Sequence, residues 1–181
     1  VVTHNAHKLM IKGKVWFLSG DIHLDVLEPI NDVDSLCQQA SLAAYRACSE
    51  MELEQVEISI LLSDDKNLQA LNKKYRGVDK PTNVLSFPNH DWKKLSHATV
   101  IPQLLGDVVI AFETTMSEAI RDGKKLEDHL SHLVVHGVMH LLGHDHEHSV
   151  QAETMETLET TTLAELGISD PYDETEVVDT G

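Results

Sequence analysis

The stretch from His136 to His146 constrains the fold more than any other part of the chain. His136 and His140 are four residues apart, so on a helix their imidazoles share one face, one turn apart. The same stretch is rich in Leu and Val, which predicts a buried helix over residues 126–142. Gly143 then ends that helix, because glycine readily adopts the left-handed conformation that follows helices. The chain can turn back there and bring His146 toward the two helical histidines.

Three histidines that converge on one point favour a divalent metal site. A single histidine on an apolar helix face is more often a core residue, so the third histidine after a helix-ending glycine carries this interpretation. Neutral imidazoles bind zinc, and three of them leave a fourth position open for water, as in catalytic zinc sites. We therefore predict one divalent metal ion held by His136, His140 and His146. The competing ligands, which we rank lower, are His132, His144 and His148.

The histidine spacing also matches the metzincin protease motif H-E-x-x-H-x-x-G-x-x-H. The three histidines and the glycine agree with that motif, but Gly137 stands where the proteases have a glutamate. Without this general base, peptide hydrolysis by the usual route lacks its proton acceptor. A protease or amidase with the same three metal ligands stays open as an alternative, with this missing residue against it.

The charge distribution limits the possible partners of the chain. A net charge of −16 opposes nucleic-acid binding, because phosphate contacts need cations. The charge is uneven, however: residues 151–181 contain nine acidic residues and no basic ones, whereas residues 66–94 contain seven basic and two acidic ones. The chain is thus acidic overall and basic in one central segment, which includes Arg76.

Length and composition indicate one globular domain. The 181 residues are 41% hydrophobic and 24% charged, as in ordinary soluble proteins with a hydrophobic core. We place the domain at residues 1–167 and expect residues 168–181, an acidic tail, to be disordered. No apolar stretch approaches the ~20 residues of a membrane helix, and the first residues hold no signal-peptide core. Cys37 and Cys48 form no disulfide framework, so we expect a cytoplasmic protein with no membrane partner.

Hydrophobic periodicity and turn residues predict alternating strands and helices. Strands are expected at residues 15–18, 55–62, 83–87 and 104–112. Helices are expected at residues 32–48, 64–75, 113–121, 126–142 and 151–166. This order favours an α/β or α+β fold, with a small mixed sheet of about four strands covered by about five helices. The metal site would then lie on a central helix and the turn that follows it.

Two polar residues fall inside the predicted strands. Asp107 lies in an apolar strand, and because a buried charge needs a partner, we expect it to make a structural hydrogen bond. Ser86 lacks the surroundings of a catalytic nucleophile, and we expect it to be an ordinary strand residue.

Four segments of the chain, in the same order, resemble one known family. His136 to His146 is similar to the signature H-G-x-x-H-L-x-G-x-D-H, and three further segments agree: LNKKYRGVDKPTNVLSFP at residues 71–88, LGDVVI at residues 105–110 and METLE at residues 155–159. The family is that of the YbeY-type endoribonucleases, the bacterial ribosomal-RNA maturation factors. The resemblance extends from about residue 57 to 166 and leaves the first 30 residues and the acidic tail outside.

The resemblance implies a zinc-dependent endoribonuclease specific for single strands. Such an enzyme matures the 3′ end of small-subunit ribosomal RNA and serves ribosome quality control, together with small-subunit ribosomal proteins. His136, His140 and His146 would be its zinc ligands and Arg76 its essential basic residue, so we assign Arg76 and His136 to the catalytic site. Arg76 could donate two hydrogen bonds to the scissile phosphate. The nucleophile would be a metal-activated water or the 2′-hydroxyl of the RNA, and no DNA substrate is expected.

A non-enzymatic ribosome-assembly factor with a structural zinc is a further alternative. Structural zinc usually has four protein ligands, so a fourth histidine such as His132 or His144 would favour this role. An open fourth position would favour catalysis.

Overall fold

The computed structural model of the protein describes residues 10–17, 32–48, 55–89, 103–144 and 149–173. Its strands are β1 (Met10–Phe17), β2 (Gln55–Ser63), β3 (Val84–Pro88) and β4 (Gln103–Ala111). They form one sheet in the order β1-β2-β4-β3. β2 pairs in parallel with β1 and β4, whereas β3 pairs antiparallel with β4. The sheet is therefore small and mixed, as predicted.

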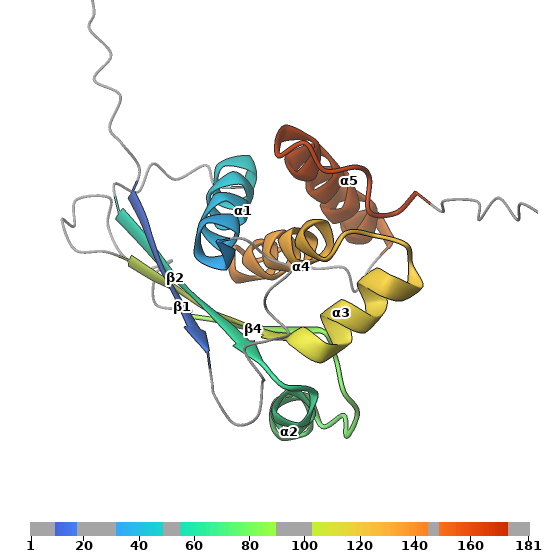
Figure 1. Cartoon of the computed structure of the whole chain (residues 1–181). Coiled ribbons are helices and arrows are strands. Elements are labelled where there is room, and N and C mark those ends of the chain that lie inside the picture. Colours follow the sequence, from blue (N-terminus) through green and yellow to red (C-terminus); the bar gives the residue numbers. More distant parts are fainter. Residues whose placement is uncertain (1–9, 18–31, 49–54, 90–102, 145–148, 174–181) are drawn as a thin grey trace, which may run out of the picture.

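Five helices occur in the described part of the chain: α1 (Val33–Cys48), α2 (Asp65–Arg76), α3 (Phe112–Arg121), α4 (Leu126–Leu141) and α5 (Ser149–Glu165). Figure 1 shows α1, α4 and α5 together on one face of the sheet. α4 is the central helix, because it contacts α1, α3 and α5 as well as β3 and β4. None of these helices has the length and apolar character needed to cross a bilayer.

The two faces of the sheet bury different hydrophobic clusters. Side chains alternate between the faces along a strand, so neighbours such as Val108 and Val109 of β4 point to opposite sides. Val108 belongs to the main core, which α1, α4 and α5 cover. Val109 belongs to a smaller cluster with Leu68 of α2. The sheet thus separates a three-helix layer from the single helix α2.

Gly137 allows α4 to lie close against the sheet. A Cβ atom at this position would be 2.5 Å from Cγ1 of Val108 and 3.3 Å from Oγ of Ser86. The Ser86 hydroxyl donates a hydrogen bond of 2.9 Å to the Gly137 carbonyl. This hydrogen bond from Ser86 connects β3 to the backbone of α4. Asp107, in contrast, is exposed, so the assumption that its charge is buried was wrong, and the hydrogen bond expected for it stays a prediction.

The predicted helices and strands are present with small shifts of their ends. The largest shift is in β1, which begins at Met10 rather than at residue 15. α4 ends at Leu141, and Gly143 has a φ of 95°, the left-handed conformation that was expected there.

The segment after α5 returns to the helices. Nζ of Lys124 donates a hydrogen bond of 2.6 Å to the Pro171 carbonyl, which ties this segment to the turn before α4. Oδ1 of Asp170 accepts from Oγ1 of Thr160 on α5 at 3.2 Å and from the backbone N–H of Tyr172 at 2.9 Å. Residues 168–173, the start of the predicted tail, are thus hydrogen-bonded to the domain. The rest of that tail lies outside the described residues, and the domain boundary at residue 167 stays a prediction.

Candidate active site

His136 and His140 project from the same face of α4, one turn apart. Their Nε2 atoms are 3.1 Å from each other, and their ring centroids are 4.6 Å apart. Two nitrogen ligands of one tetrahedral zinc ion lie about 3.3 Å apart, given Zn–N bonds of about 2.0–2.1 Å. The spacing of the two imidazoles therefore fits a pair of ligands to a single metal ion.

Glu159 of α5 sets the orientation of the His136 ring. Its Oε1 lies 2.7 Å from Nδ1 of His136, and its side chain is completely buried. An ionised carboxylate only accepts hydrogen bonds, so Nδ1 of His136 is the donor, and in a neutral ring Nε2 carries the lone pair. Nε2 is the nitrogen that faces His140. Metal-binding histidines commonly donate their other ring N–H to a carboxylate in this way, so the donor set fits a metal ion.

The second oxygen of Glu159 has its own partners. Oε2 lies 3.1 Å from Nε2 of His132, and it accepts a hydrogen bond from the hydroxyl of Tyr172. Burial raises the pKa of Glu159, but the hydrogen bonds from His132, His136 and Tyr172 outweigh that effect and hold the pKa at about 2. The carboxylate is therefore ionised at neutral pH.

His136 and His140 line a cleft of about 730 Å³. Arg76, the last residue of α2, lines the same cleft and is exposed. Gly77 ends α2 in the left-handed conformation, with a φ of 73°, and turns the chain from the helix toward β3. The remaining lining residues come mostly from β3 and from the loops before β3 and after α4: Thr82, Asn83, Val84, Ser86, Pro88, Gly143 and His144. The structure thus brings Arg76, His136 and His140 into one cleft, although Arg76 is 60 residues from His136 in sequence.

The third expected ligand, His146, lies outside the described residues, as does the competing candidate His148. Of the other competitors, His144 lines the cleft, whereas His132 contacts Glu159. In the described ranges, one group of metal-binding side chains has three ligand atoms within 4.8 Å of one another, and it consists of His132, His136 and Glu159. This group could bind a metal, but both Glu159 oxygens already accept hydrogen bonds from the two imidazoles. We therefore interpret this group as one in which Glu159 holds His136 in place, rather than as a metal site of its own.

No role for Glu159 or Tyr172 was expected from the sequence. A signal for Glu159 was present, because it shares the buried face of α5 with Met155, Thr162 and Leu163. An acid at such a position needs buried donors, and the histidines of α4 are the donors it meets. Tyr172 had no comparable signal, since it lies in the segment that was expected to be disordered.

A hydrogen-bond network fixes one rim of the cleft. Nε2 of the buried His129 lies 2.8 Å from Oε2 of Glu118 on α3. The same oxygen accepts a hydrogen bond of 3.0 Å from the side-chain amide of Asn83. Burial lowers the pKa of His129. The network therefore links α3 and α4 to the loop that carries Asn83.

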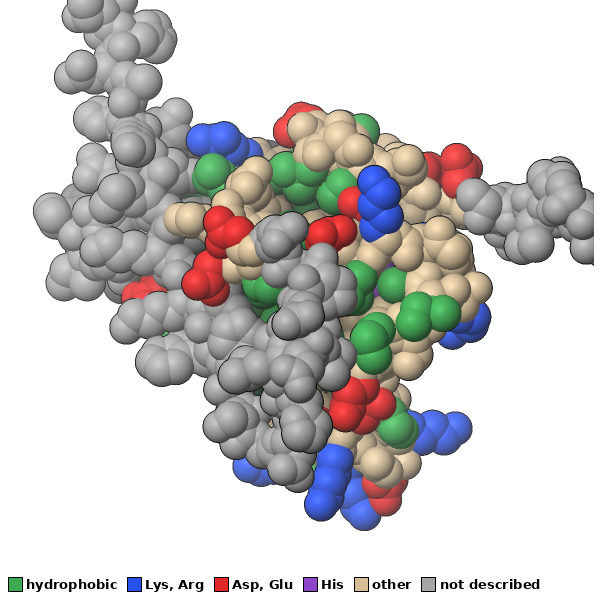
Figure 2. Space-filling model, viewed as in Figure 1, with side chains coloured by type: hydrophobic (Ala, Val, Ile, Leu, Met, Phe, Trp, Pro, Cys, Tyr) green, Lys and Arg blue, Asp and Glu red, His purple; other side chains and the backbone are tan. Residues whose placement is uncertain are grey.

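Basic side chains are concentrated on α2 and the loop that follows it. Figure 2 shows Lys and Arg side chains at the lower edge of the molecule, where Figure 1 places α2. Lys74 of α2 and Lys80 of the loop after it are exposed, as Arg76 is. Lys73 forms an ion pair with Asp79 at 2.7 Å, and such exposed pairs contribute little to stability. Despite the acidic net charge of the chain, this basic part of the surface can attract phosphate groups.

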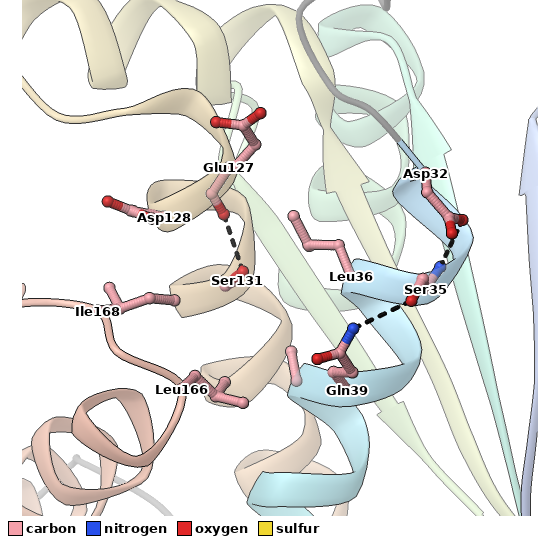
Figure 3. Close-up of a pocket in the computed structure, with 10 residues that line it drawn as sticks. Asp32, Ser35, Leu36, Gln39, Glu127, Asp128, Ser131, Leu166 and Ile168 are labelled. Atoms are coloured by element: carbon pink, nitrogen blue, oxygen red, sulfur yellow. Dashed lines mark hydrogen bonds between the residues drawn. The ribbon is translucent and has the colours of Figure 1, made fainter.

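A second hollow, of about 270 Å³, lies between α1 and α4 (Figure 3). Asp32, Glu127 and Asp128 line it, so it is unsuited to an RNA backbone. Two of its polar side chains make local hydrogen bonds: Asp32 accepts from the Ser35 backbone N–H, and the Ser131 hydroxyl donates to the Glu127 backbone carbonyl. The hollow therefore offers no chemistry comparable to that of the histidine cleft.

Comparisons with known proteins agree on one family. The family model described as Endoribonuclease YbeY matches residues 29–167. A protein from Paramagnetospirillum magneticum named Endoribonuclease YbeY is 50% identical over 147 residues, 81% of this chain and 89% of that protein. Another of that name, from Bradyrhizobium diazoefficiens, is 46% identical over 145 residues, 78% of this chain and 76% of that protein. A solution structure from Thermotoga maritima, 20% identical, covers 88% of this chain and 99% of that one with a TM-score of 0.45, too low a likeness to add to these matches.

Proposed function

The chain belongs to the endoribonuclease YbeY family, and from this membership we propose that it is a zinc-dependent endoribonuclease specific for single-stranded RNA. Its substrate in this proposal is ribosomal RNA, in particular the 3′ end of the small-subunit RNA. It would act in the cytoplasm, in ribosome maturation and quality control, together with small-subunit ribosomal proteins.

One observation carries the proposal: the Nε2 atoms of His136 and His140 lie 3.1 Å apart in the cleft that Arg76 also lines. We propose that these two histidines and His146 hold one zinc ion, with His146 included on the family motif. A zinc ion in such a site supplies a Lewis acid and lowers the pKa of a water to about 7.

Arg76 in the cleft and three side chains outside it have separate tasks in this proposal. Glu159 keeps the proton of His136 on Nδ1, so that Nε2 is free to act as a ligand. Arg76 donates two parallel hydrogen bonds to the scissile phosphate and stabilises the charge that develops on it. The exposed Lys74 and Lys80 attract the neighbouring phosphates.

Either a water or the 2′-hydroxyl of the RNA can serve as the nucleophile. Attack by the 2′-hydroxyl leaves a cyclic phosphate and requires that hydroxyl at the cleaved position. A substrate with a single 2′-deoxy nucleotide there therefore separates the two routes, because only the water route still cuts it.

Cleavage of an end-labelled RNA with a single-stranded 3′ extension tests the proposal. The zinc-loaded protein is compared with chelator-treated protein and with the His136→Ala and His140→Ala variants. His144→Ala is the matched control, since His144 lines the same cleft without a proposed ligand role. We expect cutting by the zinc-loaded protein and by the control, confined to the single-stranded part, and its loss in the other samples.

Other outcomes would favour the alternative functions. No cutting by a folded, zinc-loaded protein would overturn the proposal for free RNA and favour an assembly factor. Turnover of peptides or amides without RNA cleavage would favour the protease or amidase. Gly137 opposes that reading, because even the Cβ atom of a glutamate would collide with Val108.

A further inference from the structure

We propose that Tyr172 is a positioning residue for the metal site and acts through Glu159. Its hydroxyl holds the Glu159 carboxylate, and the carboxylate holds His136 with the Nε2 lone pair facing His140. The inference rests on the proposed role of His136 as a metal ligand. It assigns a task to a residue that lies beyond the match to the family model, which ends at residue 167.

Glu159 depends on a small number of partners. Among the described residues it is the one acidic side chain in the buried class. Its Oε1 accepts from His136 at 2.7 Å, and its Oε2 has His132 at 3.1 Å and the Tyr172 hydroxyl. Without that hydroxyl, the contact to His132 is the one that Oε2 would keep within the described part of the chain. A buried carboxylate that loses a donor can rotate toward water or toward another donor, and such rotation would shift Oε1 away from His136.

The Tyr172 hydroxyl is itself held in place. Asp170 accepts a hydrogen bond of 2.9 Å from the Tyr172 backbone, and Lys124 bonds to the adjacent Pro171 carbonyl at 2.6 Å. The Tyr172 ring packs edge-on against His132, with centroids 5.6 Å apart and planes at 82°. The backbone and the ring are thus fixed independently of the hydroxyl, so removing the hydroxyl alone should leave the segment where it is.

A purely structural role for Tyr172 is the competing explanation. In that case the side chain would cover part of the α4–α5 surface, and losing the hydroxyl would change stability but not metal binding. A positioning role predicts a change in zinc affinity and in the protonation of the His136 ring, whether or not stability changes. Tyr172 is 44% exposed, so the Tyr172→Phe variant should fold.

Zinc affinity of the metal-free protein, measured by competition with a chromophoric chelator, is the first readout. Loss of a partner of a ligating histidine typically weakens metal binding about 10- to 100-fold, and we expect that effect for Glu159→Gln. Tyr172 acts one step further away, so Tyr172→Phe should weaken binding several-fold, to at most about 10-fold. Tyr75→Phe, at an exposed tyrosine on α2, and Glu156→Gln, at an exposed glutamate on α5, are the matched controls and should bind like wild type.

The double variant Glu159→Gln with Tyr172→Phe tests whether Tyr172 acts through Glu159. We expect it to bind zinc as Glu159→Gln alone does, because the carboxylate that the hydroxyl holds is already absent. Two independent effects would instead multiply. As a second readout, the ¹⁵N shifts of the His136 ring report which nitrogen carries the proton. Wild type should show protonated Nδ1, and Tyr172→Phe a mixture of the two neutral forms.

The results separate this inference from the proposed metal site. If His136→Ala binds zinc as tightly as wild type, the proposed site itself is wrong. If His136→Ala loses zinc but Tyr172→Phe matches Tyr75→Phe in affinity and in ring-nitrogen shifts, Tyr172 is a structural residue and the inference is overturned. Should Tyr172→Phe melt far below wild type, Asp170→Ala is the second variant. It releases the Tyr172 backbone, and the same weakening of zinc binding is expected from it.

Discussion

The contact between Gly137 and Val108 predicts the effect of adding one methyl group to α4. In Gly137→Ala, the new Cβ would lie 2.5 Å from Cγ1 of Val108, whereas carbon atoms in contact are about 3.5–4.0 Å apart. An overlap of about 1 Å in a closely packed core costs about 1–3 kcal/mol. Alanine in place of glycine within a helix gains about 1 kcal/mol. We therefore expect a net loss of about 0–2 kcal/mol in the free energy of unfolding.

The sign of this effect should reverse when Val108 is shortened. Val108→Ala alone removes two buried methyl groups and should cost about 2–3 kcal/mol, including the cavity it leaves. In that background, Gly137→Ala has room for its methyl group and keeps the gain in helix propensity. It should then raise the free energy of unfolding by about 1 kcal/mol.

Urea unfolding followed by circular dichroism measures all four proteins of this cycle. Val109→Ala is the control background, because Val109 lies on the opposite face of β4 and does not meet Gly137. There, Gly137→Ala should be as unfavourable as in wild type. If Gly137→Ala stabilised the wild-type protein, or had the same effect in all three backgrounds, the packing argument would be refuted.

Three further predictions concern the cleft and the cysteines. Arg76→Ala should lower kcat/KM for RNA cleavage about 10²- to 10³-fold without altering the melting temperature, while Lys74→Ala, a neighbouring exposed cation, should have a much smaller effect. Zinc at about 100 times its Kd should add about 2.7 kcal/mol of stability and raise the melting temperature by about 5–10 °C, and in a thermal scan His136→Ala should show no such rise. Burial, assisted by the charge of Asp34, raises the pKa of the Cys37 thiol to about 12 from 9.0. Little Cys37 thiolate therefore forms at pH 8, and Cys37 should react with a disulfide reagent far more slowly in the folded protein than in the unfolded chain. Because the folded state keeps this proton longer, stability should decline as the pH rises from about 9 toward 12, which unfolding titrations at a series of pH values would detect.

Much of the fold could be predicted from patterns within short stretches of the sequence. The alternation in β2 and the helical spacing around His136 depend on which face each residue presents, and the structure has both elements nearly as predicted. The pairing of His136 with His140 followed for the same reason, because a separation of four residues on a helix fixes their distance.

The features that were missed depend on contacts between distant segments. Glu159 meets His136 only because α5 packs on α4, and neither the crossing of these helices nor the return of Tyr172 is encoded in a local pattern. Asp107 was expected to be buried because its neighbours are apolar. It lies on the same face of β4 as Val109, and the sequence did not show that this face is covered at Val109 but exposed at Asp107. Gly137 was noted as a missing glutamate, and its packing against Val108 emerged only with the sheet beneath it.

In the hydrogen-bonded series from Tyr172 through Glu159 to His136, each supporting residue comes later in the sequence than the residue it supports. Ribosomes build a protein from its N-terminus, so Arg76 is made first, then His136 and His140, then Glu159, and Tyr172 after them. A nascent or truncated chain that stops before Glu159 contains both helical histidines but not the carboxylate that orients one of them. For the proposed zinc-dependent enzyme, this order would leave unfinished copies without the group that orients His136 while they are still attached to the ribosome that is making them.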